Sequence, residues 1–305
     1  MKLTVATCQF PVDADVRRNL RYVARQIQAA KDHGAHVAHF PEACLSGYAG
    51  VDFPSFQGFD WDLLHECTQR VLDLARQCHL WVILGSTHRL TGRHKPHNSL
   101  YIINDHGTLV DRYDKRFCAG DRTGKTVDLA HYSPGNHLSV FAIQGVQCGA
   151  LICHDCRYPE LYRAYKCQGV QLIFHSYHAG HIPPTRFQAM RDTVGACLHT
   201  LNPSATLPGI TMPATMHAAA ANNYLWISCP NSSARHSCFP SFFVRPDGVI
   251  TGRVRLHTAG ILLSEVHTDA QFYDSAVAWR GRAMRGLLHS GTLVRDSRSD
   301  ERTQL

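Results

Sequence analysis

Cys153 stands where an apolar, strand-like segment gives way to a helix-like one. The apolar run Gly149–Ile152 ends at this cysteine, and the helical pattern begins at Pro159. A cysteine on such a bend lies near the positive end of a helix dipole, which favours the thiolate over the thiol. A structural cysteine is more typical of the inside of an apolar run. We therefore interpret Cys153 as a nucleophile.

Two ionisable residues also follow strand-like segments, far from Cys153 along the chain. Glu42 comes directly after Val37–Pro41, and Lys115 comes directly after Asp111–Asp114. In an open α/β fold the ends of strands meet at one crevice, so distant residues can form one site. Placement at strand ends therefore allows a thiol, a carboxylate and an ammonium group to share a site.

The residues around these three positions resemble the motifs of the nitrilase, or carbon–nitrogen hydrolase, superfamily. The motifs read FPEACLSGY over Phe40–Tyr48, DRYDKRF over Asp111–Phe117 and CHDCRYPE over Cys153–Glu160. The similarity runs from the first strand to Trp279–Met284 and covers nearly the whole chain. The resemblance implies a four-layer αββα sandwich, whereas periodicity alone supports only a mixed α/β fold.

The resemblance also implies hydrolysis of a non-peptide carbon–nitrogen bond through a thioester on Cys153. Glu42 would move the protons and activate water, while Lys115 and a backbone N–H near His154 would hold the oxyanion. These roles need no metal and no organic cofactor. The expected substrate is a small amide or N-carbamoyl compound that releases ammonia or an amine. The alternatives are a nitrile substrate, or a binding or regulatory member that has lost the reaction.

Four further residues are assigned to the site. The family often has a second glutamate before a Pro-Gly pair, and the corresponding residue before Pro134–Gly135 is Asp128, one methylene shorter. We expect Asp128 to play a supporting role. His154, which follows the nucleophile, is expected to contact substrate. His175 and Tyr177 come at the end of a strand and are expected to line the pocket.

Two other patterns favour different chemistry. Cys153 and Cys156 have the CxxC spacing of a redox pair or of half a zinc site, but the sequence has no second CxxC. His175, His178 and His181 recur every third residue, and they do not share one helix face, so only a loop could gather them on a metal. We predict neither a redox pair nor a metal site, because neither of these would explain why the glutamate and lysine motifs are also present.

The composition is typical of a large globular protein. Of 305 residues, 44% are hydrophobic and 18% are charged, which excludes a disordered chain. The net charge is +7, but the basic residues are scattered, so no nucleic-acid partner is predicted. The twelve cysteines are spread along the chain without a disulfide pattern. No signal peptide or membrane span is recognised, and we expect a cytoplasmic protein without a membrane partner.

Helix and strand patterns alternate along the chain. Helices are predicted at Arg17–Asp32, Trp61–Cys78, Pro159–Gln168 and, as the end of a longer helix, Met216–Asn223. One strand is predicted to end at Glu42. The other strands are predicted at Leu3–Phe10, Leu80–Gly85, Ser99–Asn104, Thr108–Tyr113, Leu138–Ile143, Val146–Ile152, Val170–His175, Tyr224–Cys229, Ser241–Arg245 and Ile261–Val266. The connection over 176–215 is unusually long, and it either shapes the pocket or is a surface excursion or oligomer contact.

The whole of residues 1–285 is predicted to form a single carbon–nitrogen hydrolase domain. Residues 286–305 are predicted to be a C-terminal tail. The family resemblance implies a homodimer or a larger assembly. Trp279–Leu288 is apolar on one side, so this segment could contact a neighbouring subunit.

Overall fold

The structure is a computed structural model that describes residues 1–303. A compact body spans Met1–Phe272, and a separate short unit begins at Tyr273. The short unit contains the helices α7 (Arg280–Met284) and α8 (Ser297–Asp300). The C-terminal tail that was predicted to begin at residue 286 lies within this second unit. That residues 1–285 form a single domain stays a prediction.

Two six-stranded sheets form the body. The first has the order β12-β1-β2-β3-β4-β5, with bounds Gly260–His267, Lys2–Gln9, Val37–His39, Trp81–His88, His97–Ile103 and Leu109–Asp114. The second has the order β11-β10-β9-β8-β7-β6, with bounds Ile250–Arg253, Phe242–Val244, Trp226–Cys229, Leu172–Ser176, Val146–Ile152 and Val140–Ile143. β1, β2 and β3 are parallel to one another, as are β7, β8 and β9.

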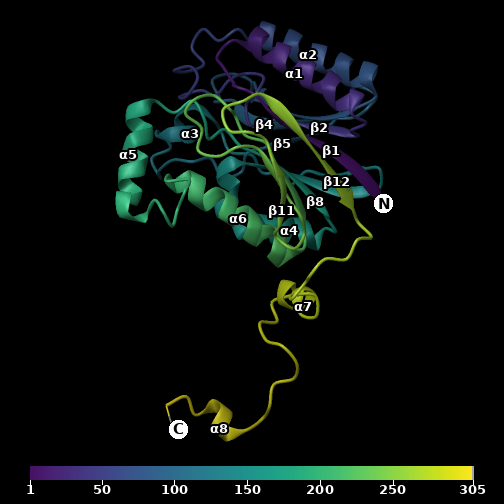
Figure 1. The fold of residues 1–305 in the computed structure, drawn as a ribbon, viewed down its shortest axis with the longest axis vertical. Helices are drawn as coiled ribbons and strands as arrows, with labels where there is room; N and C mark the ends of the chain where they lie inside the picture. Colours follow the sequence, from purple (N-terminus) through teal and green to yellow (C-terminus); the bar gives the residue numbers. More distant parts are fainter. Residues whose placement is uncertain (304–305) are drawn as a thin grey trace. The chain divides into compact units, whose positions relative to one another are not determined.

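Helices cover the outer face of each sheet (Figure 1). On the first sheet these are α1 (Val16–Asp32) and α2 (Trp61–Cys78), and on the second α4 (Pro159–Cys167) and α6 (Leu207–Asn223). The α1 helix begins where the Asp15 carboxylate accepts hydrogen bonds from two backbone N–H groups of its first turn. It buries the apolar positions Val23, Ile27 and Ala30, which recur at helical spacing.

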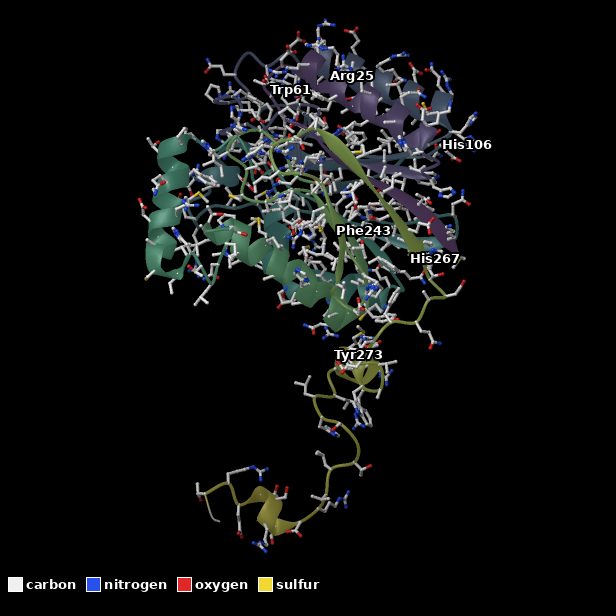
Figure 2. All side chains as sticks on the ribbon, viewed as in Figure 1. Arg25, Trp61, His106, Phe243, His267 and Tyr273 are labelled. Carbon is white, nitrogen blue, oxygen red and sulfur yellow. The ribbon has the colours of Figure 1, made fainter. Side chains whose placement is uncertain are left out.

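The main core lies between the two sheets. It joins Val5 and Ile83 of the first sheet to Leu151 and Phe174 of the second, all fully buried. Figure 2 shows Phe243 within the body, whereas His106 lies at its surface. The two packed sheets with outer helices confirm the predicted four-layer αββα sandwich.

A buried polar bridge also connects the two sheets. His39 at the end of β2 contacts Ser228 on β9 through Nδ1 at 2.8 Å, and Ser176 on β8 through Nε2 at 2.9 Å. The Ser176 hydroxyl donates to the Phe40 carbonyl oxygen at 2.7 Å. Burial lowers the pKa of His39 well below its ordinary value. The neutral imidazole therefore aligns β2, which leads to Glu42, with the strands of the other sheet.

The predicted elements are present with shifted ends, but several short elements are absent from the prediction. In the body these are β11, α3 (Val127–His131) and α5 (Pro184–Val194), with two short 3₁₀ helices, η1 (Cys153–Arg157) and η2 (Ala196–Leu198). In the second unit they are α7 and α8. No residue of α5 is fully buried. Only Phe187 and Met190 pack against the main core, so the apolar stripe is too narrow to reveal the helix in sequence. Among residues 1–303, no helix is long and apolar enough to span a membrane.

The α6 helix begins well before its predicted part. It starts at Leu207, where the Thr206 hydroxyl caps the first turn by accepting from the Gly209 N–H at 3.2 Å. Proline at the start of a helix costs little, because its missing N–H would be unpaired there in any case. The Pro- and Gly-rich composition of 176–215 therefore concealed α5 and the first turns of α6.

Candidate active site

The ends of β2, β5 and β7 bring Glu42, Lys115 and Cys153 to one end of the sandwich. Lys115 and Cys153 line a cavity of about 560 Å³. Glu42 lies behind this lining, fully buried, and its Oε1 is 2.7 Å from Lys115 Nζ. The structure thus places together the three residues that the sequence assigned to one site.

The sequence predicted a strand that ends at Glu42. In the structure β2 ends at His39, and Glu42 lies in the loop beyond it. The Glu42 N–H donates to the Tyr177 carbonyl oxygen of the other sheet at 3.2 Å. The loop also lies close to β3, because a Cβ added at Gly85 would be 1.9 Å from the Pro41 carbonyl oxygen. Only glycine permits this approach, so Gly85 is part of what positions Glu42.

Lys115 lies between two buried carboxylates. Its Nζ is 2.7 Å from Glu42 Oε1 and 2.7 Å from Asp128 Oδ2. Burial alone would lower the pKa of Lys115, but the nearby negative charges, Glu42 foremost, raise it well above its ordinary value. Asn98 donates a second hydrogen bond to Glu42 Oε1 at 2.8 Å. Glu42 Oε2 is buried and has no hydrogen-bond partner among residues 1–303, so this oxygen is available to accept a proton.

Asp128 reaches Lys115 from the short helix α3, although its side chain is a methylene shorter than glutamate. The Ala119 N–H donates to Asp128 Oδ2 at 2.9 Å, and the Tyr48 hydroxyl donates to Oδ1. Burial would raise the pKa of Asp128, but the Lys115 charge and these hydrogen bonds lower it below its ordinary value. Asp128 is therefore an anion that fixes both Lys115 and Tyr48.

Cys153 occupies a strained backbone conformation at the end of β7. Its φ is 43°, in the left-handed region that side chains disfavour. Burial, followed by the Glu42 charge, raises the pKa of the Cys153 thiol well above its ordinary value. The expectation of a thiolate favoured by a helix dipole is therefore wrong for the unliganded site. The cysteine begins the short 3₁₀ helix η1, and the longer helix α4 starts only at Pro159, beyond the range of its dipole.

Asp155 ties the nucleophile turn to the Lys115 loop, a role that the sequence alone did not reveal. Its Oδ1 accepts from the Phe117 N–H at 2.9 Å. Its Oδ2 accepts from the Ile152 N–H at 3.0 Å and from the Tyr113 hydroxyl at 2.8 Å. Burial raises the pKa of Asp155 to about 6, although the three donors oppose this shift. One buried carboxyl group thus joins residues adjacent to both Cys153 and Lys115.

Replacing Asp155 with asparagine is expected to lower the free energy of unfolding by about 1–3 kcal/mol, because one buried N–H loses its acceptor. The folded-state pKa is raised, so in the wild type this carboxyl group contributes most stability at low pH and loses it as pH rises toward about 6. The variant lacks this dependence. Urea unfolding at pH 4.5 and 7 measures both effects, and a larger stability difference at pH 7 than at pH 4.5 would contradict the assignment.

Of the three other predicted site residues, His154 lies at the cavity and two lie in the core. His154 lines the cavity, and its contact with substrate stays a prediction. His175 and Tyr177 are fully buried and do not line it, so their assignment to the pocket wall is corrected. Their rings stack with centroids 4.5 Å apart, and His175 Nδ1 is 2.9 Å from the Tyr162 hydroxyl. Burial lowers the pKa of His175 to about 3. They lie behind the nucleophile turn because β8 directs them into the core between the sheets.

His178 and His181 both contact Asp52, which the sequence did not single out. The distances to the Asp52 carboxylate are 3.0 Å from His178 Nε2 and 2.6 Å from His181 Nδ1. Burial would lower the pKa of His178, but the Asp52 charge raises it above its ordinary value. His175 is not part of this group, because it pairs with Tyr162. The three regularly spaced histidines therefore do not act as one set.

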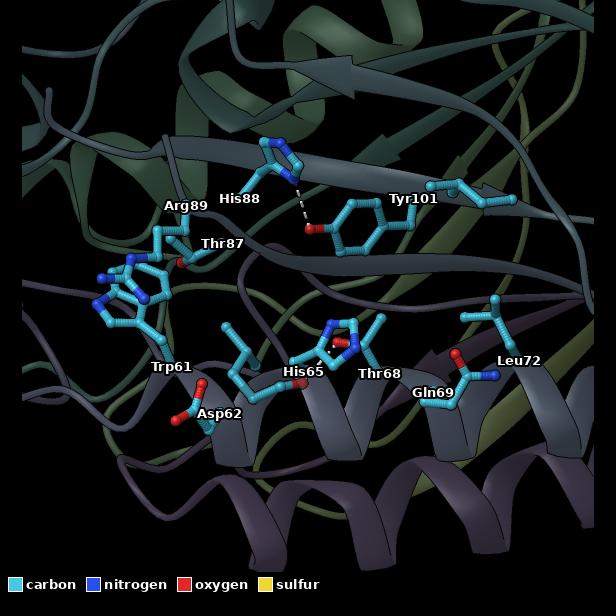
Figure 3. Close-up of a pocket in the computed structure, with 12 residues that line it drawn as sticks. Trp61, Asp62, His65, Thr68, Gln69, Leu72, Thr87, His88, Arg89 and Tyr101 are labelled. Carbon is cyan, nitrogen blue, oxygen red and sulfur yellow. Dashed lines mark hydrogen bonds between the residues drawn. The ribbon is translucent and has the colours of Figure 1, made fainter. Parts of the chain in front are cut away.

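A second cavity, of about 470 Å³, lies between α2 and the strands β3 and β4 (Figure 3). It contains the hydrogen bond between His88 Nδ1 and the Tyr101 hydroxyl, 3.0 Å long. Arg89 lies over the Trp61 ring, 5.5 Å from its centroid. None of the predicted site residues lines this cavity, so it carries none of the chemistry described above.

Residues 4–273 match the carbon-nitrogen hydrolase family. The chain belongs to this family. It is 28% identical over 177 residues to omega-amidase NIT2 of Xenopus tropicalis, a match that covers 57% of this chain and 63% of that protein. The human omega-amidase NIT2 is 27% identical over 174 residues, with 56% and 62% covered. The matched region thus spans less than two thirds of these relatives.

The fold is also found in solved structures. An amidase from Nesterenkonia sp. has a TM-score of 0.69 and 20% sequence identity, with 94% of this chain and 96% of the amidase covered. At this level of identity the likeness shows the fold alone. The strand ends that carry Glu42, Lys115 and Cys153 therefore belong to an architecture that this chain shares with an amidase.

Proposed function

We propose that the protein hydrolyses the carbon–nitrogen bond of a small amide or N-carbamoyl compound through a thioester on Cys153. The observation that carries this proposal is the buried Glu42–Lys115–Asp128 group beside the Cys153 thiol. Two facts about similar proteins support it. Curated relatives are named omega-amidases. A mutant of an amidase of the same fold shows covalent addition of the acetamide moiety of fluoroacetamide at its active site cysteine.

In the first half-reaction, Cys153 Sγ attacks the carbonyl carbon and its proton passes to Glu42 Oε2. Because the raised pKa keeps the thiol protonated, transfer must accompany attack. An ammonium group has three N–H donors, and carboxylates occupy two of those on Lys115. The third donates only a long hydrogen bond to the Tyr48 hydroxyl, at 3.4 Å, which the oxyanion can replace. The carbon–nitrogen bond then breaks as Glu42 returns the proton to nitrogen, and ammonia or an amine leaves.

In the second half-reaction, Glu42 takes a proton from water, and the resulting hydroxide attacks the thioester carbon. Lys115 again holds the oxyanion. The carbon–sulfur bond breaks, and Glu42 returns the proton to the departing Cys153 sulfur. The carboxylic acid leaves, and the site returns to its starting state without a net change in protonation.

An ammonia-release screen tests the proposed reaction. The compounds are small amides, N-carbamoyl amino acids, N-carbamoyl amines and nitriles at equal concentration. We expect turnover of an amide or carbamoyl compound and little turnover of nitriles. Preferential nitrile hydrolysis would support the alternative function. No turnover of any compound, together with unreactive Cys153, would indicate a member of the family that has lost the reaction.

The reaction is expected to be independent of added metal. Glu42, Lys115 and Cys153 already supply proton transfer, charge stabilisation and the nucleophile, so extensive chelation should change neither turnover nor melting temperature. Turnover measured before and after dialysis against a chelator checks this prediction. Loss of activity that is restored only by a stoichiometric metal ion would overturn the mechanism.

A homodimer or larger assembly is also part of the proposal. The segment from Trp279 to Leu288 exposes apolar side chains, with Trp279 45% and Leu288 85% exposed. Exposed apolar residues in a cluster are typical of an interaction surface. Light scattering at micromolar concentration should give a mass of at least two chains. A fully active monomer would contradict this prediction.

We also propose a reducing, cytoplasmic location. Within residues 1–303 the twelve cysteines are all free thiols. Free thiols are typical of a compartment that keeps cysteines reduced. The proposed reaction needs Cys153 in this form. Cell fractionation with an antibody against the protein tests the location, and recovery in a secreted fraction would contradict it.

A further inference from the structure

The wall of the site cavity formed by the segment 176–215 is mainly apolar. Ile182, Met190, Pro208 and Met212 line it, and all but Pro208 also pack against the main core. Each is only partly buried, so part of its apolar surface faces the cavity. Apolar surface left exposed in a pocket favours a ligand group that removes it from water.

This wall is held close to the nucleophile turn. Arg157 at the end of η1 donates from Nη2 to the Thr211 hydroxyl on α6 at 2.8 Å, and Met212 is the next residue. Ile182 is fixed by two backbone hydrogen bonds with His236, of 3.1 and 3.2 Å. A group attached to the carbonyl carbon under attack by Cys153 would therefore meet the apolar wall.

The charged side chains near Cys153 are already paired with one another within the protein. Lys115 is paired with Glu42 and Asp128, and His178 is paired with Asp52. Arg186 also lines the cavity, one turn before Met190 on α5, but it is exposed to solvent. A second charge on the substrate, placed next to the apolar wall, would lose its hydration without gaining a buried partner.

We propose that the cavity selects an uncharged, extended aliphatic acyl group, and that Met190 and Met212 determine this specificity. The inference rests on the proposed amide hydrolysis and narrows its substrate class. Methionine suits such a wall because its flexible, polarisable side chain adapts to chains of different length. The polar end of the cavity would hold the amide, and the wall from α5 and α6 would hold the chain.

The test is a series of primary amides from acetamide to hexanamide, with the monoamide of adipic acid as the charged counterpart of hexanamide. Each buried methylene is expected to raise kcat/KM about two- to fourfold, and the charged compound should be at least about tenfold slower than hexanamide. A preference for the charged compound that disappears in Arg186→Gln would overturn the inference and assign Arg186 to a substrate carboxylate.

Two variants test the assigned residues. Met190→Gln and Met212→Gln should flatten the rise of kcat/KM with chain length, mainly through KM, because the new amide groups hydrate the wall. Ala189→Gln is the matched control, since Ala189 is exposed on α5, the helix of Met190, and does not line the cavity. The control should keep the wild-type slope, and melting temperatures identify any variant that fails to fold.

The outcomes separate the inference from the proposed function. Equal kcat/KM along the whole series would refute the apolar specificity and leave amide hydrolysis standing. Unchanged slopes in both methionine variants would remove Met190 and Met212 from the inference. No hydrolysis of any amide, with no acyl-enzyme formed at Cys153, would instead refute the proposed function.

Discussion

Replacing Cys153 with alanine is expected to abolish turnover, with a loss of about four orders of magnitude or more. The site has one nucleophile at its centre, and without it no thioester can form. The loss is measured as the rate of ammonia release from one amide substrate by the variant and by the wild type. Cys156→Ser is the control, because Cys156 is buried beside the turn and is not needed in the mechanism. It should retain substantial activity.

Comparable inactivation of Cys153→Ala and Cys156→Ser, dependent on the ratio of oxidised to reduced thiol in the buffer, would instead support a redox pair. The pH dependence of alkylation gives a second test. Burial and Glu42 raise the pKa of the Cys153 thiol well above its ordinary value, so the neutral thiol predominates through pH 9. The alkylation rate of Cys153 should therefore still be rising above pH 9. A plateau near neutral pH would show a thiolate in the free enzyme.

Replacing Asp128 with asparagine is expected to lower kcat/KM by about 30- to 1000-fold, which corresponds to about 2–4 kcal/mol of lost transition-state stabilisation. Asp128 holds Lys115 Nζ at 2.7 Å and accepts from the Tyr48 hydroxyl. Asparagine keeps the shape of the side chain but removes the charge that fixes the ammonium group. Steady-state kinetics and urea unfolding, measured on the same preparation, separate a catalytic defect from lost stability.

Asp128→Glu provides the conservative comparison. It restores the charge and adds the methylene that the family pattern has at this position, so it should recover much of the activity if the cavity accepts the longer chain. Glu42→Gln should be inactive, because it removes the group that moves the protons. Wild-type kinetics in Asp128→Asn, with Glu42→Gln inactive, would show that the Asp128 charge on α3 is not needed for the reaction.

The sequence by itself determined the amphipathic helices, every strand except β11, and the three residues that follow strands. The α2 helix, Trp61–Cys78, and the β7 strand, Val146–Ile152, have the predicted bounds. Such elements follow from local rules, because their apolar periodicity and their end residues lie within one short segment. Glu42, Lys115 and Cys153 could be grouped because the residues around them resemble three motifs of one family, and because strand ends converge in this class of fold.

Only the tertiary structure decided which groups those residues contact and how they ionise. Asp155 and Asp52 act through partners that lie far away in sequence, such as Tyr113 and His178, and no local pattern encodes such pairs. The protonated state of Cys153 depends on burial and on the Glu42 charge, which outweigh the local dipole. Desolvation and distant charges are properties of the packed chain, so they exist only once the two sheets have come together.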